Sequence, residues 1–384
     1  MIYFDQAASS FPKPPEVGEA MVYALNEAGA NPGRGSHKLA RDAANLIQET
    51  RERASRVFGC TDPKKALFYP NATVALNQAI KGYPLEAGDH VIASSFEHNS
   101  IRRPLEYLKK QKGIVVTYIK WEEDSNQFIH NVKSAISSNT KLIAMTHASN
   151  LTGAILPIEE VAELAHKNSI ITLVDGSQTA GHTEINMTAQ GIDMLVFSGH
   201  KGLLGPQGTG MLLVEGNIQL EPIHHGGTGA HSESVGQPDQ WPEKYESGTL
   251  NTPGIAGLNA AMKQFEKRQN ENVPRETLLA KKLLTGLKTI PGITCYGPDE
   301  HQPRMPIVTF NVRNISSQEM AMILDSHYDI AVRAGLHCSP LGHESLDTME
   351  RGAVRASLGI YNTDAEVNTF LKAVSEIVAA YEQL

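Results

Sequence analysis

Short apolar runs alternate with amphipathic stretches through the first half of the chain, and this alternation constrains the fold most strongly. Runs with the length and composition of strands occupy residues 66–69, 90–94, 114–119, 141–146, 170–174 and 194–197. Stretches with helical spacing lie between them at 74–81, 100–112, 130–137 and 157–168. This order is typical of a mostly parallel sheet that helices cover on both faces. The sequence therefore predicts an α/β fold.

The pattern changes on both sides of this alternating region. Helical spacing precedes it at 16–29 and 38–58, and a polar stretch at 222–252 follows it. The later elements are expected to be a helix at 254–268, a helix from about 275, a strand at 307–312, a helix at 317–325 and a helix at 364–382. A chain of 384 residues is long enough for two domains. We predict a large α/β domain over residues 14–260 and a smaller C-terminal α+β domain over 261–384.

Polar residues follow the predicted strands at their carboxyl ends. They are Asn71, His98, Asn150, Asp175 and Lys201. Ligands of open parallel sheets bind beyond these strand ends. We therefore expect the five side chains to lie around one site.

Lys201 and Asp175 point to a specific chemistry. Lys201 comes just after a buried run, where an ammonium must be paired or lose its proton, and only a neutral amine attacks an aldehyde. Asp175 ends the preceding run, and an acid can hold the ring nitrogen of pyridoxal 5′-phosphate charged while a lysine takes its aldehyde. A structural ion pair between strand ends is the alternative that these two residues alone leave open.

Charge and cysteine content argue against several other classes of protein. The formal net charge is −8, which disfavours a basic surface for nucleic acid. The cysteines, Cys60, Cys295 and Cys338, have no CxxC spacing, so neither a disulfide framework nor a thiolate zinc site is indicated. No apolar run approaches the roughly 18–20 residues of a membrane span, and no leader-like pattern is seen. We expect a cytoplasmic protein that binds no membrane and no metal.

A series of short motifs runs through nearly the whole chain. In order they are Asp5-Gln6-Ala7-Ala8, Arg34-Gly35-Ser36-His37, Glu97-His98, Ser149-Asn150, Leu173-Val174-Asp175-Gly176-Ser177-Gln178, Phe197-Ser198-Gly199-His200-Lys201, Gly248-Thr249-Leu250-Asn251-Thr252 and Arg333-Ala334-Gly335-Leu336-His337-Cys338. Together they resemble the class V aminotransferase family of pyridoxal-phosphate enzymes, and within it the group II type of the cysteine desulfurase branch. The resemblance implies fold type I: a large domain with a mostly parallel seven-stranded sheet, and a small domain that the N-terminal arm (1–13) joins. It also implies a homodimer.

The resemblance further implies roles for residues toward pyridoxal 5′-phosphate. Lys201 would bind the aldehyde, Asp175 the ring nitrogen, and His98 would stack on the ring and act as an acid–base group. The other expected contacts are Ala72, Thr73, Ser198 and His200 at the phosphate, Thr249 reaching across to the phosphate in the partner subunit, and Asn150 and Gln178 at the ring 3-hydroxyl. Outside this frame, Thr73 is expected to be a helix N-cap, because threonine favours that position.

On the substrate side, Arg355 resembles the arginine that holds the amino-acid carboxylate, which a guanidinium fork can bind bidentately. Arg333 is expected to help with the same charge. The substrate is also expected to contact Asn150, and His37 to line the entrance.

Cys338 resembles the cysteine that takes sulfur from L-cysteine and leaves L-alanine. This chemistry needs a thiolate on a partly exposed, mobile segment, and residues 339–342 are expected to form a loop. Arg333 and His337 are expected to favour the thiolate. The predicted function is a cysteine desulfurase that passes sulfur to a protein acceptor, as in iron–sulfur cluster assembly.

Two alternatives to this function follow from the same residues. Another class V activity, such as a selenocysteine or cysteine-sulfinate lyase or an aminotransferase, is suggested by Leu336, which stands where the group II type often has histidine. A metal-binding protein would use His224, His225, His231 and the cluster His337, Cys338 and His343. These spacings match no zinc pattern well.

Overall fold

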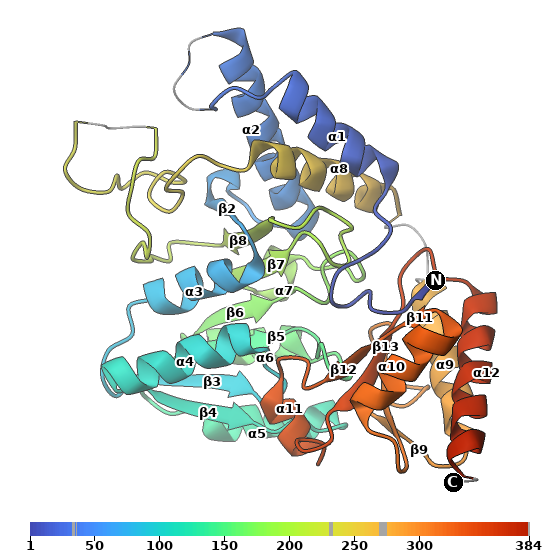
Figure 1. The fold of residues 1–384 in the computed structure, drawn as a ribbon. Coiled ribbons are helices and arrows are strands. Elements are labelled where there is room, and N and C mark those ends of the chain that lie inside the picture. The colour runs from blue at the N-terminus through green and yellow to red at the C-terminus, as the bar shows by residue number, and fades with distance from the viewer. Residues whose placement is uncertain (33–34, 36, 230–232, 269–274, 383–384) are drawn as a thin grey trace.

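The main sheet of the protein has seven strands in the order β2-β8-β7-β6-β5-β3-β4 in the computed structural model of the chain (Figure 1). The structure describes residues 1–384 except 33–34, 36, 230–232, 269–274 and 383–384. The strands are β2 (Ala66–Tyr69), β3 (His90–Ser94), β4 (Val115–Ile119), β5 (Thr140–Thr146), β6 (Ile171–Asp175), β7 (Met194–Ser198) and β8 (Gly210–Val214). β3 to β7 run parallel, and β8 is antiparallel to its neighbours β7 and β2. The predicted α/β class with a mostly parallel sheet is confirmed.

The sequence pattern does not predict β8, because this strand follows directly on a glycine-rich turn. All of its residues are nevertheless buried. A Cβ added to Gly210 would lie 2.5 Å from the backbone carbonyl carbon of Asn71. Glycine is therefore required where β8 passes the turn between β2 and α3, a turn that borders the candidate site.

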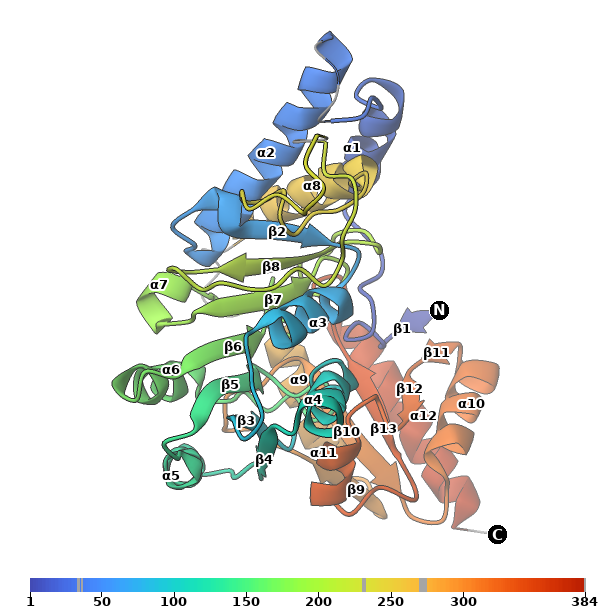
Figure 2. The same cartoon turned by 90° about the vertical axis from the view of Figure 1, so that its left-hand side faces the viewer.

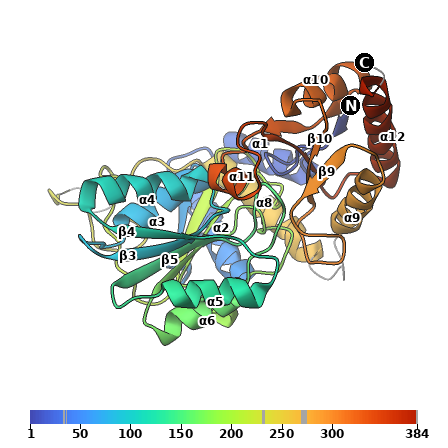
Figure 3. The ribbon, with the colours of Figure 1, turned by 90° about the horizontal axis from the view of Figure 1, so that it is seen from below.

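Helices cover both faces of the main sheet. α3 (Ala72–Gly82) and α4 (Asn99–Lys112) lie on one face, and α5 (Ser125–Ala135) and α6 (Ile158–Lys167) on the other (Figure 3). Side chains of the central strands are buried in both directions, which explains their continuous apolar runs. The short α7 (Met187–Gln190) precedes β7. Beyond the β2 edge, α8 (Thr252–Arg268) packs against α1 (Pro15–Asn26) and α2 (Lys38–Phe58) (Figure 2).

Local capping residues set several helix ends. α5 begins at Ser125 rather than near residue 130, because the Asp124 side chain accepts a hydrogen bond from the backbone N–H of Asn126 and caps the helix. α2 ends at Phe58, and its C-cap Gly59 has the left-handed conformation that favours glycine. Within the described part of the chain, no helix has both the length and the apolar character needed to cross a bilayer.

A second sheet is antiparallel, with the order β12-β13-β10-β9. Its strands are β9 (Ile293–Tyr296), β10 (Ile307–Val312), β12 (Arg333–Gly335) and β13 (Ala353–Ser357). The remaining C-terminal elements are α9 (Arg275–Lys288), α10 (Ser317–Tyr328), α11 (Pro340–Ser345) and α12 (Asp364–Tyr381). Their shared core includes Leu324, Phe310 and Phe370.

The N-terminus lies against this C-terminal part of the molecule (Figure 1). β1 (Ile2–Tyr3) pairs in parallel with β11 (Ile330–Ala331). The predicted division into domains at residues 13/14 and 260/261 stays a prediction, and the second boundary lies inside α8.

Candidate active site

A cavity lies where the carboxyl ends of the main strands face the antiparallel sheet. Its lining includes most of the predicted site residues, namely Ala72, Thr73, His98, Asn150, Asp175, Gln178, Ser198, His200, Lys201, Arg333, Cys338 and Arg355. Residues that follow or end the strands β2, β3, β5, β6 and β7 therefore meet at one place, as expected for an open parallel sheet. His37 and Thr249 are not among the lining residues.

Lys201 and Asp175 reach the cavity from neighbouring parallel strands. β6 ends at Asp175, which is in register with Val196 of β7, and Lys201 follows the end of β7. Burial lowers the pKa of Lys201 to about 8, with Asp175 opposing this shift and two arginines adding to it. Near pH 8 a substantial fraction of the Lys201 side chain is therefore neutral amine, the form that attacks an aldehyde. The Asp175 carboxylate accepts a hydrogen bond of 2.9 Å from the backbone N–H of Ser177.

Near the N-terminus of α3, the cavity lining includes buried polar atoms that have no hydrogen-bond partner among the described residues. Ser198 Oγ and His200 Nδ1 are buried and hydrogen-bond to no described residue. Burial lowers the pKa of His200 to about 4, so its ring is neutral near pH 7. The cap of α3 is Asn71, whose side chain accepts from Val74 N–H at 3.0 Å, and the expectation that Thr73 is the cap is wrong. Unpaired donors beside a helix N-terminus suit an anionic ligand.

His98 caps helix α4 and also lines the cavity. Its Nδ1 accepts the backbone N–H of Ser100 at 3.0 Å and caps α4. An Nδ1 that accepts leaves the proton of the neutral ring on Nε2. Burial, together with nearby Lys201, lowers the pKa of His98 to about 4. The ring is therefore neutral near pH 7, with an Nε2–H that can donate.

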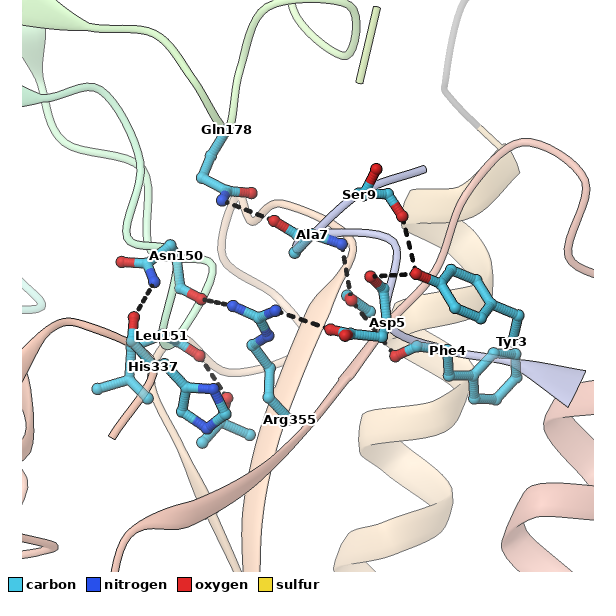
Figure 4. Close-up of polar contacts among 12 residues, drawn as sticks. Tyr3, Phe4, Asp5, Ala7, Ser9, Asn150, Leu151, Gln178, His337 and Arg355 are labelled. Atoms are coloured by element: carbon cyan, nitrogen blue, oxygen red, sulfur yellow. Dashed lines mark hydrogen bonds and ion pairs between the residues drawn. The ribbon is translucent and has the colours of Figure 1, made fainter. Parts of the chain in front are cut away.

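Arg355 lies on β13, and its guanidinium is already engaged (Figure 4). Its Nη2 donates to Asp5 Oδ1 at 2.9 Å and its Nη1 to the backbone oxygen of Asn150 at 2.8 Å. The Asn150 side chain in turn donates to the backbone oxygen of His337 at 2.7 Å, and Gln178 donates to that of Ala7 at 3.1 Å. The two amides expected near the cofactor hydroxyl thus bind carbonyls of the protein itself in this structure (Figure 4).

Cys338 is exposed and lines the cavity, on a segment between β12 and α11. Its φ of 58° lies in the left-handed region, as does the φ of 50° at His337. The Cys338 oxygen accepts from the backbone N–H of Asn99 at 2.8 Å, which ties the segment to the start of α4. Residues 339–342 were expected to be a loop, and this is wrong: Pro340 begins α11, since proline is tolerated in the first helical turn.

His337 does not supply the positive charge expected beside Cys338. Burial and the nearby Arg355 lower its pKa to about 3, so the ring is neutral. Its Nε2 lies 3.0 Å from the backbone oxygen of Ala353. Among the two expected neighbours, only Arg333 can favour the thiolate by charge.

Two predicted residues lie outside the cavity. His37 is exposed and caps α2, with its Nδ1 accepting from Ala40 N–H at 3.3 Å. Thr249 lines a separate hollow with Trp241 and Leu250. Of the motif residues around His37, Arg34 and Ser36 lie outside the described residues.

Of the residues in the metal-binding alternative, His231 lies outside the described residues. In the ranges that are described, no three His, Cys, Asp or Glu side chains are grouped so that they could hold a metal ion. The rings of His337 and His343 stack, with centroids 5.8 Å apart.

Three side chains of the site are missing from the sequence-based list. Ser177 Oγ is buried without a described partner, Ser100 Oγ lies 2.7 Å from Thr73 Oγ1, and Asp5 pairs with Arg355. Ser177 and Asp5 stand within quoted motifs, so a signal was present for both. Ser100 has only its position two residues after His98.

Comparison with known proteins identifies similar chains over nearly the full length. The family model described as "Aminotransferase class-V" matches residues 2–370. A protein named "Probable cysteine desulfurase" from Methanothermobacter thermautotrophicus is 33% identical over 98% of this chain and 94% of its own length. A "Cysteine desulfurase" from Escherichia coli is 31% identical over 98% of this chain and 93% of its own. The solved apo structure of a cysteine desulfurase from Thermococcus onnurineus has a TM-score of 0.92 and 32% identity, covering 99% of this chain and 95% of that one.

Proposed function

Since the chain belongs to the class V aminotransferase family, we propose that it is a pyridoxal-phosphate-dependent cysteine desulfurase that converts L-cysteine to L-alanine. The observation that carries this proposal is the shared cavity of Lys201 and Cys338. A lysine whose pKa is lowered to about 8 and an exposed thiol face the same space, with two arginines beside them. An aldehyde-binding amine, a carboxylate site and a nucleophilic thiol are what this conversion requires.

The residues that are present fit the cofactor. Ser177 Oγ, Ser198 Oγ and His200 Nδ1 are buried with no hydrogen-bond partner among the described residues, and a phosphate would give such donors acceptors. In this proposal Ala72, Thr73, Ser198 and His200 would hold the phosphate, Asp175 would hold the ring nitrogen, and Asn150 and Gln178 would bind the ring hydroxyl. Pyridoxal phosphate, when bound, supplies an electron sink for the bonds at the α-carbon of the amino acid.

The chain's own residues perform the sulfur transfer. Arg355 and Arg333 hold the substrate carboxylate, and the Cys338 thiolate attacks the sulfur of L-cysteine. A sulfur–sulfur bond forms and the carbon–sulfur bond breaks, with its electron pair going to carbon, which then takes up a proton. The products are L-alanine and a persulfide on Cys338, whose outer sulfur a thiol on an acceptor protein can take. His98 is in place to move the proton, because its ring is neutral and lines the cavity.

Thr249 fits this function in a homodimer. It is exposed in the single chain and lies away from the cavity, so a phosphate contact by Thr249 requires a second subunit. Mixing inactive Lys201→Ala subunits with inactive Thr249→Tyr subunits should restore some activity if sites are shared. Self-contained sites would restore none.

The test of the function is the fate of L-cysteine given to the cofactor-loaded protein. We expect equal amounts of L-alanine and of sulfur recovered as sulfide in the presence of a thiol reductant. Without the reductant, mass spectrometry should find the persulfide on Cys338. Cys338→Ser should keep the cofactor yet make no persulfide, while Cys295→Ala, which removes a half-buried thiol elsewhere, should behave like the wild type.

Two results would redirect the assignment. Undiminished L-alanine release by Cys338→Ser would indicate a direct lyase. Faster turnover of selenocysteine or cysteine sulfinate than of L-cysteine, or transfer of the amino group to a keto acid, would indicate another class V activity.

A further inference from the structure

The backbone oxygen of His200 is held by several donors from the N-terminal arm. Ser10 donates to it from its backbone N–H at 3.0 Å and from its Oγ at 3.1 Å, and Lys13 Nζ donates at 2.8 Å. Ser9 Oγ approaches the same oxygen at 3.4 Å. A carbonyl oxygen has two lone pairs, so four donors are more than it needs to be satisfied. The peptide that joins His200 to Lys201 is therefore a specific point of contact for the arm.

Lys13 is the charged donor of this group. Its Nζ also donates to Ser10 Oγ at 2.7 Å, and it forms no ion pair with any described residue. Burial lowers the pKa of Lys13 to about 8, but most of the amine is still charged near pH 7. A partly buried ammonium without an anion costs free energy unless strong hydrogen bonds offset the cost. Lys13 is not among the residues that line the cavity, so it acts on the site through the His200 peptide.

Backbone hydrogen bonds fix the turn that carries Lys201 on both sides of the His200 peptide. Gly199 N–H donates to the Thr209 oxygen at 2.9 Å, and Leu204 N–H donates to the Lys201 oxygen at 2.8 Å. The His200 oxygen bonds to the arm instead, so the arm sets the orientation of this peptide. The side chain of Lys201 starts at the next Cα, and a tilt of the peptide would therefore displace its amine.

The arm keeps its own shape without the Lys13 side chain. Phe11 N–H donates to Gln6 Oε1 at 2.9 Å, and Gln6 Nε2 donates back to the Phe11 oxygen at 2.7 Å. Ahead of this loop, β1 pairs with β11. Replacing Lys13 therefore removes its contact with His200 and leaves the rest of the arm held in place.

We propose that Lys13 is a positioning residue for Lys201: its ammonium holds the oxygen of the His200–Lys201 peptide and so places the Lys201 amine for bonding to the cofactor aldehyde. This inference rests on the proposed function, in which Lys201 binds that aldehyde. The neutral amine adds to the aldehyde carbon, a carbon–nitrogen double bond replaces the carbon–oxygen double bond, and water leaves. Such a bond forms well only when the reacting atoms are held in the right geometry.

The test compares pyridoxal 5′-phosphate with pyridoxine 5′-phosphate, which has the same ring and phosphate but a hydroxymethyl group that cannot form this bond. Their dissociation constants are measured by calorimetric titration of the cofactor-free, full-length protein near pH 7. The ratio of the two constants reports the bond to Lys201, because the contacts of ring and phosphate cancel. Lys13→Met keeps an unbranched apolar chain but has no donor. It should lower the preference for the aldehyde by about tenfold, the lower end of what a hydrogen bond from a charged group contributes.

Two variants test the hydrogen bonds themselves. Lys13→Arg keeps the charge and the N–H donors, and its ratio should lie closer to the wild type than to Lys13→Met. Ser10→Ala removes another donor to the His200 oxygen and the acceptor that holds Lys13 Nζ. Its ratio should fall less than in Lys13→Met, because the backbone N–H of Ser10 still donates to His200.

Two controls separate this role from general loosening of the site. Ser198→Ala removes a proposed phosphate contact, so it should weaken binding of both compounds equally and leave the ratio at the wild-type value. Lys112 Nζ donates to the Leu85 oxygen at 3.3 Å, away from the cavity. Lys112→Met therefore removes a comparable contact between a lysine and a backbone oxygen, and it should change neither constant.

The inference is overturned if the ratio for Lys13→Met stays within twofold of wild type or, where that variant does not fold, if Ser10→Ala does so. An equal fall of the ratio in Ser198→Ala would overturn it as well.

Turnover of L-cysteine by the wild type is a separate measurement. If L-alanine is not formed while Lys13→Met lowers the ratio, the proposed reaction fails and the role of Lys13 stands. If L-alanine is formed and the ratio does not move, only the role of Lys13 fails. Equal binding of the two compounds by the wild type would overturn both, because Lys201 would then form no bond to the aldehyde.

Discussion

On the side of the main sheet, polar atoms of Ser177, Ser198 and His200 are buried with no partner among the described residues. On the side of the small sheet, Arg355 Nε and His337 Nδ1 also lack such partners, but the charge of Arg355 is paired with Asp5. An unpaired hydroxyl is tolerable where a ligand normally sits, but an unpaired buried charge is far more costly. The difference fits a lasting ligand, the proposed cofactor, on one side and a transient one, the amino acid, on the other.

The largest loss of activity is expected at Lys201, on the cofactor side of the cavity. Lys201→Ala removes the only predicted amine for the cofactor aldehyde, and turnover should fall to background. After borohydride reduction, the wild type should carry the cofactor on the peptide that contains Lys201, and the variant should carry none. Lys13, whose Nζ lies 2.8 Å from the His200 oxygen, is the nearby lysine to check. Cofactor trapped on Lys13 in the wild type would contradict the assignment.

Asp175 should matter for rate more than for substrate affinity. Asp175→Asn nearly preserves shape but loses the charge that keeps the ring nitrogen protonated. We expect turnover to slow by more than about tenfold, equivalent to about 1.4 kcal/mol of barrier, with a small change in KM. Steady-state kinetics at saturating cofactor measure this. A near-normal kcat would argue against a role in the chemistry.

Arg355 should show the opposite pattern, because it belongs to the substrate half. Arg355→Lys keeps the charge that faces Asp5 but loses the guanidinium fork. KM for L-cysteine should therefore rise by about tenfold, with a smaller change in kcat. The same change at Arg351, whose Nη2 donates to the Val312 oxygen away from the cavity, is the control. Equal effects of the two substitutions would mean that Arg355 only stabilises the small sheet.

The same division explains which parts of the molecule could be predicted from sequence. β3, β5, β6 and β7 are buried on both faces, so each reads as an apolar run. A residue shortly after each run lines the cavity, namely His98, Asn150, Asp175 and Ser198. The pair of Asp5 and Arg355 joins residues 350 positions apart, and no local pattern reports such a contact. The short β12 reads as neither strand nor helix, so the pairing that sets Arg333 opposite Arg355 was not visible either.

Glu97 is expected to give the smallest effect. It is a buried ionisable group that, unlike Arg355, forms no ion pair with any described residue. It is 0% exposed and accepts hydrogen bonds from the backbone N–H groups of Ser94 at 3.2 Å and Thr146 at 3.0 Å. Burial raises its pKa to about 8. The folded protein therefore holds a proton on Glu97 that the unfolded chain has released above its ordinary pKa near 4.5.

The sign of the expected pH effect follows from this proton. The stability that protonated Glu97 contributes is complete below pH 4.5 and is lost as the pH rises to about 8. Relative to Glu97→Gln, which cannot ionise, the wild type should lose at most about 1.4 kcal/mol of unfolding free energy per pH unit across this window. Urea unfolding of both proteins at pH 5.5, 6.5 and 7.5 measures the difference, and costs of the substitution that do not depend on pH cancel in the slope.

Glu16→Gln, at an exposed position on α1, should show no such slope. Parallel pH profiles for the wild type and Glu97→Gln would mean that the folded protein keeps the Glu97 carboxylate ionised without a cation beside it. An ion pair such as that of Arg355 with Asp5 would then not be required for a buried group in this protein to stay charged.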